Sequence, residues 1–159
     1  MAKPTRELAT LWWDWLSTAE RLIITLHEQT AALTLRQVER IENLQPELDS
    51  LMDRMQEIDG QAVACAKKLA GDLGTEPNLR SLVDALEKAE AQEIQSIANR
   101  VIVVGRNVQQ IVAKNKALVE NEIEFVNGTM ALVAREALEN RSNYKARSHD
   151  SSVLLNQVA

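Results

Sequence analysis

The sequence has few of the residues that turn-rich and β-sheet proteins need. Its 159 residues include only five glycines and three prolines, and 3% of them are aromatic. Proteins built from β-strands need many more turn residues and aromatic side chains. With 45% hydrophobic and 26% charged residues, the composition favours an all-α fold, and the length suits a single domain with a sizeable core.

Cysteine and histidine are also scarce, which excludes several kinds of site. Cys65 is the only cysteine, so neither an internal disulfide nor a cysteine-rich metal site is expected, as is usual in the cytoplasm. The only histidines are His27 and His149, and neither follows a glutamate by three residues, the spacing that di-metal sites in four-helix bundles use. A glycine-rich phosphate loop is absent too. We expect a protein that is not an enzyme and uses no metal ion or cofactor.

The chain has no long apolar run and no basic stripe. No window approaches the about 18 apolar residues of a membrane span, and charged residues interrupt the segment MAKPTRELATLWWDW, where a signal peptide needs an apolar core. The net charge of −5 disfavours nucleic-acid binding, because proteins neutralise phosphates with Lys and Arg. We expect a cytoplasmic protein that neither binds nucleic acid nor inserts into a membrane.

Apolar residues at helical spacing are abundant. They predict a first helix over about residues 5–30, in which Trp12 and Trp15 pack inside and Trp13 is partly exposed. Thr34 and Gln37 have the spacing of a capping box that would open a second helix, with Leu33 and Val38 as its hydrophobic staple. That helix has nine apolar positions in unbroken 3-4 alternation, typical of a coiled-coil seam: Ile41, Leu44, Leu48, Leu51, Met55, Ile58, Ala62, Cys65 and Leu69.

Pro46 lies inside this seam, where it removes a backbone donor. Either the helix kinks before the proline or a new helix starts at Gln45, and the unbroken seam favours the kink. Gly71 and Gly74 then predict a helix end and a reversal of the chain. A short helix is expected around residues 79–86.

A long last helix is predicted from about residue 89 to 139, roughly 75 Å at 1.5 Å per residue. The polar sequence that follows has no periodicity and predicts a mobile tail. The chain would thus be an elongated antiparallel helical bundle or coiled coil over residues 1–140, with a flexible C-terminal tail over residues 141–159.

Apolar side chains occupy about half the circumference of this last helix. A first stripe falls within about one quadrant and is enough to pack against the bundle; it consists of Val119, Ile123, Val126, Met130 and Val133. A second stripe lies roughly 80–120° away and consists of Leu118, Phe125 and Leu132. Either a three-helix core buries both stripes, or one of them is an open groove for a partner helix.

Three further residues bear on that choice. Gly128 costs the helix about 1 kcal/mol relative to alanine, and Met130 has a flexible side chain that adapts to different partners, although both also occur in ordinary cores. Asn115 falls close to the apolar seam, where a polar residue fixes the register of packed helices or bonds to a partner.

Several stretches resemble the FlgN family of flagellar type III export chaperones. AALTLRQVERIENLQPELDSLM is similar to the family's junction between its first helix and an acid-rich second helix, and SLVDAL at 81–86 to its short third helix. The most specific match is NKALVENEIEFVNGTMALV at 115–133, followed by Tyr144 in a basic, polar tail.

This resemblance implies a cytoplasmic chaperone that binds the C-terminal helices of hook-associated proteins, the proteins of the hook–filament junction, before export. It also implies that Tyr144 helps to dock the complex on the cytoplasmic domain of the export gate. The alternative is a coiled-coil adaptor or structural protein that uses its second stripe for self-association, and a homodimer is possible in either case. The resemblance together with the second stripe gives the expected substrate contacts: Asn115, Leu118, Val119, Phe125, Val126, Met130 and Leu132.

Overall fold

The computed structural model describes residues 3–148, and the side chains of residues 3–143. That part contains four helices and no strand: α1 (Lys3–Thr34), α2 (Val38–Leu73), α3 (Leu79–Ala85) and α4 (Lys88–Ser148). The predicted all-α class is confirmed. The chain divides into two compact units, unit 1 (Met1–Lys116) and unit 2 (Ala117–Ala159), so α4 contributes to both. The division predicted at residue 140 stays a prediction.

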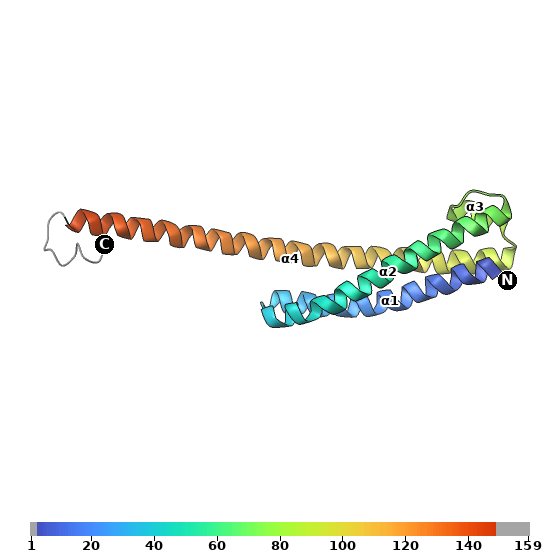
Figure 1. Ribbon diagram of the computed structural model, residues 1–159, viewed down its shortest axis with the longest axis horizontal. Coiled ribbons are helices and arrows are strands. Elements are labelled where there is room, and N and C mark those ends of the chain that lie inside the picture. The colour runs from blue at the N-terminus through green and yellow to red at the C-terminus, as the bar shows by residue number, and fades with distance from the viewer. Residues whose placement is uncertain (1–2, 149–159) are drawn as a thin grey trace. The chain divides into compact units, whose positions relative to one another are not determined.

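Unit 1 is a bundle of α1, α2, α3 and the first part of α4. The helices α1 and α2 are joined by a tight turn and pack closely against each other in opposite directions. The short α3 follows the end of α2, and the first part of α4 then runs along the bundle in the same direction as α1 (Figure 1). The predicted antiparallel arrangement is confirmed within this unit.

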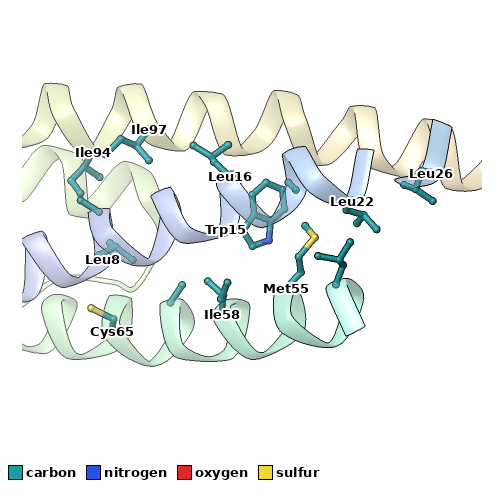
Figure 2. Close-up of a cluster of buried hydrophobic side chains, with 14 of the residues drawn as sticks. Leu8, Trp15, Leu16, Leu22, Leu26, Met55, Ile58, Cys65, Ile94 and Ile97 are labelled. Atoms are coloured by element: carbon teal, nitrogen blue, oxygen red, sulfur yellow. The ribbon is translucent and has the colours of Figure 1, made fainter. Parts of the chain in front are cut away.

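The core of unit 1 forms where three helices contribute apolar stripes. Figure 2 shows Ile58 from α2 and Ile94 from α4 on either side of the stretch of α1 that carries Leu8 and Leu22. All four side chains have at most 1% of their surface exposed. Truncating one of the leucines to alanine would cost about 2–5 kcal/mol, because close-packed neighbours relax only partly into the space left behind.

The seam predicted for α2 is confirmed. Eight of its nine positions are buried, and Ile41, the first of them, is half-buried. Pro46 lies within α2, which is continuous from Val38 to Leu73. A new helix at Gln45 is therefore wrong, since only the single backbone donor of Pro46 is lost and the seam stays in register.

The capping box predicted at Thr34 is wrong. Thr34 lies in the last turn of α1, and its Oγ1 donates to the carbonyl of Thr30 at 2.8 Å. The backbone N–H of Gln37, which Thr34 was to cap, donates instead to the carbonyl of Ala32 at 2.9 Å. Arg36 adopts a φ of 55° and closes the turn, so α1 ends in a Schellman motif with a non-glycine residue in the left-handed position. Val38 is exposed, and the predicted staple is therefore not formed.

The predicted end of α2 and the short helix after it are confirmed. Gly74 has a φ of 65° and donates to Gly71 O, while the N–H of Thr75 donates to Ala70 O, which is a second Schellman motif. The side chain of Asn78 then caps α3 by accepting from the N–H of Ser81 at 2.8 Å. These caps fix the chain reversal that leads into α4.

The tryptophans of α1 lie as predicted. Trp15 is buried, Trp12 is half-buried, and Trp13 is partly exposed. The guanidinium of Arg100 on α4 lies 5.4 Å from the centre of the Trp13 ring, within the range of a cation–π interaction. A Cβ built at Gly105 on α4 would lie 3.6 Å from Trp15, an ordinary packing distance. The Arg100–Trp13 contact and the close approach of Gly105 to Trp15 show that α1 packs against the first part of α4.

Candidate functional site

The most unusual surface of the described chain is the apolar side of α4 within unit 2. Every side chain from residue 123 to 143 is exposed, although many of them are large and apolar. The name α4 apolar surface is used here for the exposed large apolar side chains of α4 in unit 2: Val119, Ile123, Phe125, Val126, Met130, Leu132, Val133 and Leu138. Soluble proteins rarely leave so many neighbouring apolar side chains uncovered unless a partner binds there.

Both stripes predicted on this helix are exposed. Phe125 and Leu132 of the second stripe have 57% and 62% of their surface accessible. The first stripe was expected to pack in the bundle, and that expectation is wrong, because Met130 and Val133 are 66% and 62% exposed. A three-helix core over both stripes is therefore wrong as well. Helical periodicity predicted which residues share a face, but the bundle core of unit 1 uses the part of α4 before Lys116.

Sequence reasoning missed three members of this surface as partner contacts. Ile123 and Val133 have the same spacing as bundle-facing residues and were assigned to the core for that reason. Leu138 lies on another side of the helix and belongs to neither stripe. In the sequence, the signal that sets this segment apart is the width of its apolar arc. Leu118, which was predicted as a contact, is half-buried.

Gly128 lies midway along this segment of α4, on the side of the helix away from Val126 and Met130. A Cβ built at Gly128 would meet no atom within 4 Å, so packing does not require a glycine there. Thr129, the next residue, donates its hydroxyl to the carbonyl of Phe125 at 2.9 Å, within the helix. The glycine lowers helix stability at this point by about 1 kcal/mol relative to alanine, and the helix is continuous across it.

Asn115 is buried where α4 crosses the end of α1 in unit 1, with only 4% of its surface exposed. Its amide nitrogen donates to the carbonyl of Leu26 at 3.1 Å and to Oε1 of Gln29 at 2.9 Å. Its Oδ1 accepts from the hydroxyl of Thr30 at 2.6 Å. Asn115 thus holds α4 to α1, as expected for a polar residue near a seam. Its predicted contact with a substrate stays a prediction and would require these bonds to break.

The last predicted contact lies outside the described side chains. Tyr144 is part of α4 by its backbone, but nothing is described of its ring. The helix itself extends to Ser148, so the predicted helix end near residue 139 is wrong. Polar residues can continue a helix, but they show no apolar periodicity. The periodicity in the sequence therefore ends before the helix does.

The described residues contain neither a metal site nor a membrane span. No group of three or more His, Cys, Asp or Glu side chains among them could hold a metal ion. No helix within residues 3–148 is long and apolar enough to cross a membrane. Burial and the nearby Glu7 carboxylate raise the pKa of Cys65, which disfavours the reactive thiolate.

Comparison with known proteins gives a single finding. The family model described as FlgN protein matches residues 1–151, which is nearly the whole chain. No curated protein and no solved structure matches the chain. The FlgN family is a family of flagellar export chaperones, and an exposed apolar helix is what a protein that binds other proteins' helices requires. The chain therefore belongs to the FlgN family.

Proposed function

We propose that this chain is a cytoplasmic chaperone that binds the C-terminal helical segment of hook-associated flagellar proteins and delivers them to the type III export gate. Membership of the family supports a flagellar export chaperone in general. The observation that supports a helical substrate is the α4 apolar surface, whose side chains are 40–66% exposed. An amphipathic helix covers such a surface by laying its own apolar face along it.

The dimensions of the surface suit this kind of partner. From Val119 to Val133 its two stripes extend for about 21 Å along the helix axis, or roughly four turns. The two stripes lie side by side, so that a helix bound between them would touch Val126 from one stripe and Phe125 from the other. We propose that the substrate lies along this line.

The binding free energy expected from this surface predicts a complex of moderate affinity. Covering a half-exposed Leu, Val, Met or Phe side chain yields about 1 kcal/mol, from the usual 1.5–3 kcal/mol for complete burial. The seven exposed side chains of the two stripes together yield about 7 kcal/mol, and the ordering of a flexible segment opposes binding by several kcal/mol. The resulting affinity is moderate, as export requires, because the chaperone must release its substrate.

Acidic side chains next to the surface indicate which partner helices fit. Glu122 lies between the two stripes on the helical wheel, and Glu136 lies beside the second stripe. A substrate helix with Lys or Arg opposite Glu122, or at the edge of its apolar face near Glu136, would pair with these carboxylates. We expect such charges to affect mainly the selection of partners and the association rate.

Docking on the export gate is the second part of the proposal. The family resemblance supports Tyr144 as a docking residue, and Tyr144 follows the α4 apolar surface along the same helix. A chaperone with this order of sites presents the gate-docking residue while the surface before it holds the substrate.

Co-expression with C-terminal segments of hook-associated proteins tests the proposal. The proposal predicts a complex of fixed stoichiometry that survives size-exclusion chromatography. If no segment binds and the chain instead forms a dimer through the α4 apolar surface, the self-association alternative is correct. The two outcomes are distinguished by measuring the mass of the eluted species with light scattering.

A further inference from the structure

A groove lies between α1 and α2 in unit 1, separate from the α4 apolar surface. It has a volume of about 770 Å³. We call it the α1–α2 groove and define it by its lining residues: Lys3, Arg6, Glu7, Thr10, Leu11, Gln61, Ala64, Cys65 and Lys68.

The groove is basic although the protein is acidic. Its lining includes three cationic side chains, Lys3, Arg6 and Lys68, and one carboxylate, that of Glu7. The whole chain, in contrast, has a net charge of −5. The first turn of α1 contains no acidic residue, so the positive end of the helix dipole adds to the same local potential. A concave surface lined by one sign of charge attracts ligands of the opposite sign.

The groove also has apolar lining. Leu11 is half-buried and Cys65 is buried, with its Sγ donating to the carbonyl of Pro4 at 3.4 Å. Ala64 is small and exposed, which leaves room for a side chain from a ligand. A ligand that fits must therefore present apolar groups to the centre of the groove and negative charge to its edges.

We propose that the α1–α2 groove docks an acidic amphipathic helix of a partner protein. The partner's apolar side chains lie over Leu11 and Ala64, and its Asp or Glu side chains pair with Lys3 and Lys68. Nucleic acid fits less well, because no aromatic side chain lines the groove for base stacking. This second docking surface lies entirely in unit 1, and its existence does not depend on what the α4 apolar surface binds.

A peptide selection on the full chain tests this proposal. The probe is a displayed library of random amphipathic helical peptides, and among the enriched peptides whose binding survives Phe125→Ala with Leu132→Ala we expect Asp or Glu flanking Leu, Ile or Phe. Their affinity is then measured by fluorescence anisotropy. Reversing two charges with Lys3→Glu and Lys68→Glu should weaken binding by about tenfold or more, as the loss of two ion pairs implies.

Matched variants distinguish the groove from other effects. Lys67→Glu changes the same total charge as Lys68→Glu, but Lys67 is exposed outside the groove, so this variant should bind the peptides normally. Phe125→Ala with Leu132→Ala should also leave this binding unchanged, even if it removes substrate binding by α4. Circular dichroism checks that every variant stays helical.

Several results would overturn the proposal. It fails if selection yields no peptides, if the peptides have no acidic bias, or if the paired reversal leaves their affinity unaltered. Equal losses in Lys67→Glu and Lys68→Glu would mean that net charge alone attracts the peptides. Binding to phosphatidylglycerol vesicles that the reversal abolishes, without peptide binding, would mean that the groove is a membrane contact.

Discussion

Replacing Asn115 with alanine separates its internal role from its predicted role as a substrate contact. The substitution removes three side-chain hydrogen bonds, to Leu26, Gln29 and Thr30. Each is worth about 1 kcal/mol net, and alanine recovers roughly half a kcal/mol of helix propensity. We expect unit 1 to lose about 2–3 kcal/mol of unfolding free energy.

Thermal unfolding monitored by tryptophan fluorescence measures this loss, because all three tryptophans lie in α1. At the lower end of this range, a loss of about 2 kcal/mol corresponds to a fall in Tm of about 8 °C for a unit of this size. Asn107→Ala is the matched control, since Asn107 is an exposed asparagine on the same helix with the same gain in propensity. We expect its stability to change by no more than about 0.5 kcal/mol.

A double-mutant cycle with Thr30→Val isolates the shortest of the three bonds. The coupling energy between Asn115 and Thr30 should be about 0.5–1.5 kcal/mol. If Asn115→Ala is no more destabilising than Asn107→Ala, the bonds of Asn115 do not hold α4 to α1. If Asn115→Ala instead removes substrate binding at unchanged Tm, Asn115 contacts the substrate directly and its bonds to α1 contribute little.

Three other predictions follow from the turns, the thiol and the end of α4. Gly74→Ala should lower the free energy of unfolding by about 1 kcal/mol, because φ at this position is 65°. Gly60 lies inside α2 with open space around a built Cβ, so Gly60→Ala should raise the free energy of unfolding by about the same amount. Urea unfolding of both variants measures the difference. Alkylation of Cys65 should be slow and should reach half its maximal rate at a higher pH in the folded protein than in the urea-unfolded chain, because burial raises the pKa of this thiol; half-maximal alkylation at the same pH in both states would contradict the burial. By the same shift, the contribution of Cys65 to the free energy of unfolding is fully present below the pKa of the unfolded thiol and is lost as the pH rises through the higher pKa of the folded one. Truncation after Asn140 should leave substrate binding intact and impair motility, and loss of binding would mean that the binding surface extends beyond that residue.

Much of the fold was predictable because α2 buries one continuous face. Its seam from Ile41 to Leu69 repeats with helical spacing and needs no knowledge of the partner helices. Glycine at position 74 likewise has a local role that the sequence reveals. Thr34 was misjudged because a threonine near a helix end either caps the next helix or bonds back to its own, and only the path of the chain decides which.

The candidate site was less predictable, because a helical period identifies a face but not what covers it. Val126 and Met130 have the spacing of core residues, yet both are exposed. The deciding fact is where the bundle core ends, at about the position of Asn115, and this depends on the lengths of α1 and α2. The hydrogen bonds from Asn115 to Gln29 and Thr30 connect residues more than 80 positions apart and have no local signal in the sequence.

Titration calorimetry of the chain with the C-terminal segment of a hook-associated protein tests the central claim most directly. We predict that Phe125→Ala with Leu132→Ala weakens binding by about a hundredfold, because about 1–1.5 kcal/mol is lost at each position, while Tm stays unchanged. The control, Ile24→Ala with Val63→Ala, removes two equally exposed apolar side chains from unit 1 and should bind normally. Normal binding by the Phe125 and Leu132 variant, or its unfolding, would contradict the account.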